Sequence, residues 1–252
     1  MRREEFPAHR PGWEQTIDEE GLTYSIDFPG DTHYWNEYAA YVFTPDEMDS
    51  IRAQSEQIHK MCLNAVEYMA SGAFGTLGLP EPAFQLAIES WNQQDPDFYG
   101  RFDFTYSGIP GDPLKLLEYN ADTPTGMVEA AVSQKTWAKD QRLDTRGYAH
   151  WGEIGEAFTN RWRHIFAAEI AAGVQPVLHL AHVTAEIDEN NEDYNNLWLI
   201  AYAAQQAGIK TVEPYGKDTA RSVPKRTIQP RHAQHSNASM ANVHAAMSLM
   251  PT

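Results

Sequence analysis

The chain has 252 residues, of which 42% are hydrophobic and 12% aromatic, a composition typical of a globular protein rather than a disordered one. Its formal net charge of −16 argues against nucleic acid or an anionic membrane surface as the main partner, since phosphate binding requires clustered Lys and Arg. Cys62 is the only cysteine, which excludes an intrachain disulfide and a cysteine-built metal site. No apolar run is long enough to span a membrane, and no apolar stretch follows the charged N-terminus, so we expect a cytoplasmic protein.

A long helix is predicted to begin after Thr44. Thr44 can cap the helix, Pro45 suits its first position, and Glu47 completes a capping box. Apolar residues then recur at the spacing of one helical face, at Met48, Ile51, Ile58, Met61, Ala65 and Met69. We therefore expect a helix over 45–71 and a second one over about 82–93.

Residues 101–120 predict a β-hairpin. The segments 101–107 and 114–120 read as strands, and the sequence Gly-Ile-Pro-Gly-Asp-Pro between them is typical of a turn. Further along, the pattern predicts helices at about 127–139, 150–172 and 191–207, a buried strand at 176–181 and an extended segment at 210–212. This mixture of helices and strands predicts an α+β fold with a mixed sheet.

Three regions are expected along the chain. Residues 1–29 form an N-terminal extension, and residues 30–212 form the domain. Residues 213–252 differ in character, because they contain five basic side chains against two acidic ones and show no sustained apolar period. We expect this basic tail to be poorly ordered.

The predicted hairpin gathers four polar side chains on one face. Residues two apart in a strand share a face, so Arg101 lies with Asp103, and Glu118 lies with Asn120. If the strands pair symmetrically about the turn, Asp103 faces Glu118 and Arg101 faces Asn120. The other face of the hairpin then carries an apolar set consisting of Phe102, Phe104, Leu117 and Tyr119.

Two directly opposed carboxylates repel each other. A cation between them removes this repulsion, and both carboxylates then act as its ligands. Carboxylate and amide oxygens from Asp103, Glu118 and Asn120 suit Mg²⁺, with water and phosphate completing its octahedron. Arg101 beside them supplies a positive charge for a phosphoryl group. The alternative on spacing alone is an exposed polar face on which Arg101 pairs with Asp103, since a one-residue slip in register destroys the cluster.

The motif around this hairpin resembles the glutathionylspermidine synthase family. The resemblance is carried by Gly-Arg-Phe-Asp-Phe at 100–104 and by Leu-Leu-Glu-Tyr-Asn-Ala-Asp-Thr-Pro-Thr at 116–125. The segment 134–137 and the Glu-Asp-Tyr segment at 192–194 with the helix after it are also similar, and the resemblance runs from about residue 35 to residue 211. It implies a pre-ATP-grasp-like domain with part of an ATP-grasp-type core.

The resemblance also implies an activity. Such ligases use ATP and Mg²⁺ to phosphorylate a carboxylate, and an amine then displaces the phosphate to make an amide. Small-molecule acids and amines of a glutathione-like, polyamine-like or peptide-like kind are the expected substrates. By motif, the roles are phosphoryl stabilisation for Arg101, magnesium ligation for Asp103, Glu118 and Asn120, and substrate binding for Thr123 and Glu192.

Family members continue for a further segment that supplies lysines for the ATP phosphates and an adenine pocket, whereas here the basic tail follows residue 212. We therefore expect a truncated chain without appreciable ligase activity. One alternative is a non-catalytic remnant that binds Mg²⁺, a peptide-like substrate or a partner subunit. Another is a hydrolase that uses Asp103 and Glu118 as acid and base. The substrates and the oligomeric state stay open.

Overall fold

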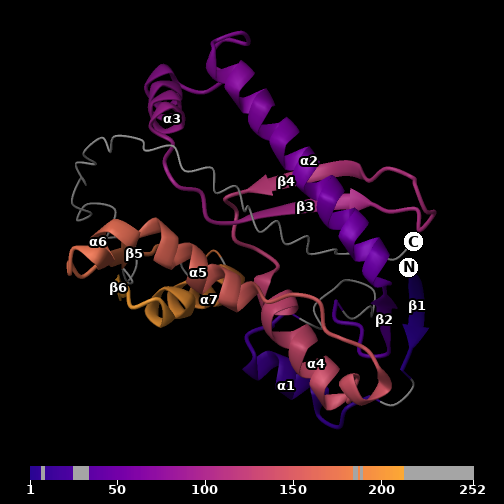
Figure 1. Cartoon of the computed structure of the whole chain (residues 1–252). Helices are drawn as coiled ribbons and strands as arrows, with labels where there is room; N and C mark the ends of the chain where they lie inside the picture. Colours follow the sequence, from indigo (N-terminus) through magenta and orange to yellow (C-terminus); the bar gives the residue numbers. More distant parts are fainter. Residues whose placement is uncertain (7–8, 25–33, 184–186, 188–189, 213–252) are drawn as a thin grey trace. The chain divides into compact units, whose positions relative to one another are not determined.

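The computed structural model describes residues 1–6, 9–24, 34–183, 187 and 190–212 (Figure 1). Contacts divide the described residues into two units, one from the ranges 1–43 and 123–212 and the other from the range 44–122. Helices are combined with small sheets, so the predicted α+β class is confirmed. The described strands form three separate two-stranded sheets rather than the one mixed sheet that we expected. The predicted tail at 213–252 lies outside the described residues.

The described residues of the second unit form two helices and a hairpin. These elements are α2 (Pro45–Ala70), α3 (Glu81–Gln93), β3 (Gly100–Thr105) and β4 (Lys115–Ala121). Helix α2 begins as predicted, because Thr44 accepts a hydrogen bond from the Glu47 backbone N–H, and the Glu47 carboxylate accepts one from the Thr44 backbone N–H. Within α2 only Ile51 and Ser55 are buried, so most of its apolar stripe is half-buried or exposed.

The β3–β4 hairpin packs its apolar face against α2. The Phe102 ring stacks on Tyr119 with 4.0 Å between ring centroids, and the Tyr119 hydroxyl lies 3.2 Å from His59 Nδ1 on α2. An irregularity follows Asp103, so that Phe104 pairs with Leu116. Our prediction that Leu117 belongs to the apolar face was wrong. The extra residue in β4 turns Leu117 outward, and 66% of its surface is exposed.

The first unit contains the remaining elements. They are β1 (Arg2–Glu5), α1 (Trp13–Glu19), β2 (Ala39–Val42), the π-helical η1 (Glu129–Ser133), α4 (Gln134–Asp140), the 3₁₀ helix η2 (Asp144–Arg146), α5 (Ile154–Ile165), α6 (Ala167–Ala171), β5 (Val177–His179), α7 (Glu192–Gln206) and β6 (Lys210–Val212). Strand β1 pairs antiparallel with β2, and β5 pairs parallel with β6. The single helix expected at 150–172 is divided at Phe166 into α5 and α6. Strand β5 was expected to be buried, but Val177 is exposed because β6 is its one described neighbour.

The N-terminal segment belongs to the core of the first unit. Phe6 packs edge-on against Trp137, with ring centroids 5.0 Å apart, and Ile17 is fully buried. The cluster consists of Phe6, Trp13, Ile17, Leu22, Trp35, Val128, Trp137 and Leu143. This packing differs from our expectation of a separate extension at 1–29, because residues before and after residue 30 share one apolar cluster. Within the described ranges, no helix is both long and apolar enough to cross a membrane.

A buried ion pair lies beside this cluster. The Arg10 guanidinium donates to both carboxylate oxygens of Glu37 at 2.9 and 3.0 Å, and Glu37 is 1% exposed. The Trp35 indole donates to the same carboxylate at 2.8 Å, and Arg10 also donates to Asp140 at 3.1 Å. Hydrogen bonding to Glu37 and Asp140 raises the pKa of Arg10 against the opposing effect of its burial. A fully buried carboxylate is thereby satisfied by the nearby Trp35 and by Arg10, which is distant in sequence.

Replacing Glu37 with Gln should destabilise the first unit. The substitution leaves Arg10 partly uncompensated in the interior, which costs about 3–5 kcal/mol for a broken buried pair. Urea unfolding followed by tryptophan fluorescence measures the change. The matched control is Glu5→Gln, which removes an exposed partner of Arg3 and should change stability by less than about 1 kcal/mol. Equal effects of the two substitutions would contradict this account.

Candidate functional site

The polar face of the β3–β4 hairpin has the predicted register. Asp103 pairs with Glu118 and Arg101 pairs with Asn120 across the two strands, which are labelled in Figure 1. The pairing brings two carboxylates, an amide and a guanidinium to one face. The irregularity falls between Asp103 and Phe104, beyond these pairs, so it leaves their alignment intact. This part of the prediction is confirmed.

Arg101 and Asp103 form an ion pair on this face. Arg101 Nε donates to Asp103 Oδ1 at 3.0 Å, and Nη2 donates to Oδ2 at 3.4 Å. This hydrogen bonding raises the pKa of Arg101 above its usual value, although partial burial opposes the shift and the nearby Glu118 charge adds to it. The side chains of Arg101 and Asp103 are 20% and 25% exposed, so the pair is open to solvent on one side.

Asn120 connects the two halves of the face. With its amide oriented so that both groups are satisfied, Asn120 donates to Glu118 Oε1 at 3.0 Å and accepts from Arg101 Nη2 at 3.2 Å. Asp103, Arg101, Asn120 and Glu118 therefore form one continuous hydrogen-bonded network. Two carboxylates and one guanidinium leave this face with a formal charge of −1.

The apolar side of the hairpin holds the backbone beneath this network. Phe102 is 1% exposed and lies between Phe104 and Tyr119, with ring centroids 5.3 and 4.0 Å away. Burial raises the pKa of Tyr119 to about 12, so the ring stays a neutral packing element. A Cβ atom on Gly100 would lie 2.7 Å from Tyr119 Cε2, which explains the glycine at the start of β3.

Asp122 follows the last residue of β4 and had no role assigned from the sequence. Its backbone adopts a left-handed conformation with φ 53°, which Asp tolerates better than most residues. Its backbone N–H donates to the Tyr99 carbonyl at 2.8 Å, and its carboxylate accepts from the backbone N–H groups of Phe98 and Tyr99 at 3.3 and 3.4 Å. The acidic residue of the Asn-Ala-Asp segment thus fixes the open end of the hairpin. Its place at the end of a predicted strand was the available signal.

The donor set of the polar face fits a hard divalent cation. Asp103 and Glu118 offer carboxylate oxygens from opposed positions, and Asn120 offers an amide oxygen. Mg²⁺ is bound in proteins by one or two carboxylates with waters and phosphate in the remaining positions. In the described part of the chain, no three His, Cys, Asp or Glu side chains are grouped for a metal. The hairpin therefore offers a partial ligand set, of the kind that leaves positions for water and phosphate.

The two predicted substrate-binding residues lie in the first unit, so the structure does not test whether they meet the hairpin. Glu192 begins α7, and its charge acts on Tyr24. Burial first, and then the Glu129 charge, raise the pKa of Tyr24, which donates to Glu129 Oε1 at 2.8 Å. Tyr34 donates to the same oxygen at 2.7 Å. Thr123 follows the hairpin directly, at the start of the segment that returns to the first unit.

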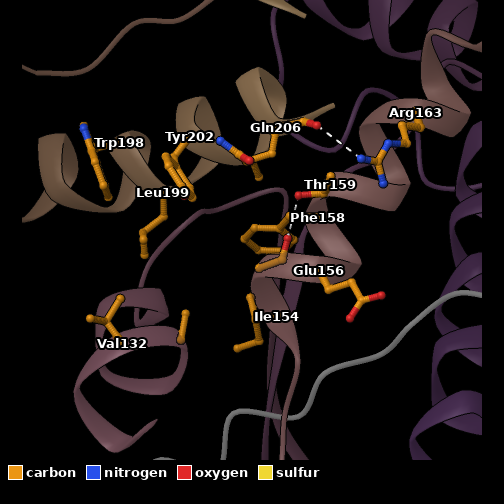
Figure 2. Close-up of a pocket in the computed structure, with 13 residues that line it drawn as sticks. Val132, Ile154, Glu156, Phe158, Thr159, Arg163, Trp198, Leu199, Tyr202 and Gln206 are labelled. Carbon is orange, nitrogen blue, oxygen red and sulfur yellow. Dashed lines mark hydrogen bonds between the residues drawn. The ribbon is translucent and has the colours of Figure 1, made fainter. Parts of the chain in front are cut away.

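A separate cavity of about 490 Å³ lies in the first unit, between η1, α5 and α7 (Figure 2). Apolar side chains such as Val132, Phe158 and Leu199 form much of its wall. Arg163 lies at one end and donates to the Gln206 carbonyl at 3.2 Å. No residue that we selected from the sequence lines this cavity, because a groove between helices distant in sequence leaves no local pattern.

Comparison with known proteins gives consistent results. The family described as Glutathionylspermidine synthase preATP-grasp matches residues 4–238. A Haemophilus influenzae protein provisionally named an acid–amine ligase is 33% identical over 205 residues, which are 81% of this chain and 49% of that protein. The trypanothione synthetase of Crithidia fasciculata is 29% identical over 132 residues, 52% of this chain and 18% of the synthetase. The glutathionylspermidine synthase of the same organism is 25% identical over 134 residues, 53% of this chain and 17% of the synthase.

The fold and the hairpin define an α+β domain with a polar, cation-compatible strand pair. The chain belongs to the glutathionylspermidine synthase preATP-grasp family, whose match covers most of its length. Relatives of the chain carry ligase, synthetase and synthase names, so the family is one of ligases. The matched region spans about half the length of the Haemophilus protein and less than a fifth of each Crithidia protein.

Replacing Gly100 with Ala should disturb this hairpin from its apolar side. The added methyl group meets the Tyr119 ring, which is held by Phe102 and cannot move freely, and overpacking of this kind costs about 1–3 kcal/mol. Hydrogen exchange at the hairpin amides measures the loss. Gly155→Ala is the control, because its Cβ has no neighbour within 4 Å and α5 is helical there, so its stability should be kept or raised. Unchanged exchange in the Gly100 variant would show that the ring is not locked.

Proposed function

We propose that the hairpin is the magnesium and phosphate site of an ATP-dependent acid–amine ligase. The observation that carries the proposal is the register that sets Asp103 opposite Glu118 and Arg101 opposite Asn120. Opposed carboxylates are unfavourable unless a positive charge compensates them, and ligation of a cation supplies that charge. Membership of a ligase family supports the same chemistry.

Each residue has a distinct part in this proposal. Asp103, Glu118 and Asn120 hold Mg²⁺ through side-chain oxygens, and the ion supplies charge neutralisation for the ATP phosphates when bound. Arg101 stabilises the phosphoryl group during its transfer to the acid, since a fixed guanidinium matches phosphate oxygens. The amine then attacks the acyl carbon, the C–O bond to phosphate breaks, and the amide forms with loss of a proton from the amine.

The names of the relatives support a proposal for the class of substrate. Trypanothione synthetase and glutathionylspermidine synthase point to a thiol peptide or a similar acid, and to a polyamine or a similar amine. We propose that Thr123 and Glu192 contact the acid substrate. Glu192 is an acidic residue in the first turn of α7, and a carboxylate there suits an ammonium group on a peptide. We propose that the reaction takes place in the cytoplasm.

Cation-dependent nucleotide binding tests the hairpin directly. We predict that the chain binds ATP at least tenfold more tightly with Mg²⁺ than without it, and that Asp103→Asn and Glu118→Gln each remove most of this gain. Isothermal titration measures both affinities. Glu5→Gln, which removes an exposed carboxylate from another strand, should bind as the unaltered chain does. Loss of the Mg²⁺ effect in all four proteins would contradict the proposed site.

Turnover is a separate prediction. ATP brings several negative charges to a face that already carries two carboxylates, and Arg101 is the single cation among its four polar residues. Phosphoryl transfer needs further cationic contacts on the phosphates, so the chain by itself should bind without appreciable turnover. ADP release with acid and amine pairs is the measurement. Steady ADP production that Arg101→Ala abolishes would contradict it, and cleavage of an amide without nucleotide would favour the hydrolase alternative.

A further inference from the structure

Arg101 acts as a counter-cation of the polar face. Its Nε and Nη2 donate to the two carboxylate oxygens of Asp103 at 3.0 and 3.4 Å, and Nη2 also lies 3.2 Å from the oxygen of the correctly oriented Asn120 amide. Glu118 accepts from the other end of that amide at 3.0 Å. Oxygen atoms of Asp103 and Asn120 that would ligate a cation are therefore occupied by one guanidinium.

This arrangement puts two uses of Arg101 in conflict. A guanidinium that donates through Nε and Nη2 to Asp103 does not offer the same donors to a phosphate. Likewise, Asp103 gains its full ligand capacity only when Arg101 moves away. We propose that Arg101 is an internal placeholder, released from Asp103 when the hairpin takes a divalent cation and thereby made available to a phosphate. This inference rests on the proposed magnesium site.

The local structure permits such an exchange by side chains alone. Arg101 and Asp103 are partly exposed, so the guanidinium can leave without opening a buried cavity. The backbone under them is held by Phe102, which is 1% exposed and stacked on Tyr119. Asn120 also donates to Glu118 Oε1 at 3.0 Å, a contact that does not involve Arg101. The hairpin thus provides a fixed frame with one exchangeable ion pair.

The formal charge of the polar face favours binding of the cation before the phosphate. Two carboxylates and Arg101 give the face a formal charge of −1, which disfavours a phosphate before a cation is bound. With a divalent cation the same face carries +1 and Arg101 is freed. Binding linkage is reciprocal, so a phosphate that binds the released Arg101 must tighten cation binding by the same factor. The release of Arg101 from Asp103 therefore couples binding of the cation to binding of the phosphate.

Metal affinity tests the placeholder without any need for activity. Mn²⁺ alone is the probe, with its binding followed by electron paramagnetic resonance in the unaltered chain, in Arg101→Met and in Arg3→Met. Arg3 is a matched control, because it also pairs with an acid two residues along a strand, Glu5, at 2.9 Å. We expect about tenfold tighter Mn²⁺ binding in the Arg101 variant, the size typical of one lost charge-assisted interaction, and no change in the control.

A second measurement needs no substitution. The Nε–H signal of Arg101 in a nitrogen-15 spectrum should shift when Mg²⁺ is added, and shift again with inorganic pyrophosphate. An unshifted signal, or equal Mn²⁺ affinity in the Arg101 variant and the unaltered chain, overturns the placeholder. If Asp103→Asn still abolishes Mn²⁺ binding in that case, the proposed magnesium site survives. Absence of Mn²⁺ binding from every protein tested overturns both.

Discussion

Two carboxylates face each other across neighbouring strands of the β3–β4 hairpin, and the chemistry of the site depends on how their repulsion is relieved. Arg101 relieves part of it by pairing with Asp103, while Asn120 links Arg101 to Glu118. Because each strand alternates its faces, the same register that opposes the acids also buries Phe102 against Tyr119. The polar site and the packing beneath it are therefore fixed by one pairing of strands.

The ion pair between Arg10 and Glu37 in the first unit is buried, unlike the pair between Arg101 and Asp103. Arg10 and Glu37 are almost fully enclosed, and Trp35 and Asp140 satisfy their remaining groups. Such a pair has no room to exchange partners, and it serves to connect distant segments. The Arg101–Asp103 pair is partly exposed, with side chains that are 20% and 25% accessible to solvent. The two ion pairs thus differ in exposure. The buried Arg10–Glu37 pair stabilises the fold, and the partly exposed Arg101–Asp103 pair can respond to a ligand.

The hairpin was predictable from sequence because its determinants are local. Alternation in the strands and the Gly-Pro turn specify the register, and the capping box at Thr44 specifies the start of α2. The irregularity that displaces Leu117 was not predictable, since one extra residue in a strand has no distinct local pattern. The N-terminal segment was misjudged for another reason. Contacts such as Phe6 with Trp137 join residues far apart in the chain, and hydrophobic spacing within either segment does not identify its partner.

The most direct measurement is anomalous diffraction from crystals of the chain grown with Mn²⁺. The proposed site predicts one strong peak about 2.1–2.2 Å from oxygens of Asp103, Glu118 and Asn120, as expected for a small hard cation. In the same map Arg101 should have left Asp103. A peak elsewhere, or Arg101 still paired with Asp103 beside an unoccupied hairpin at saturating Mn²⁺, would contradict the claim that this strand pair is a cation site.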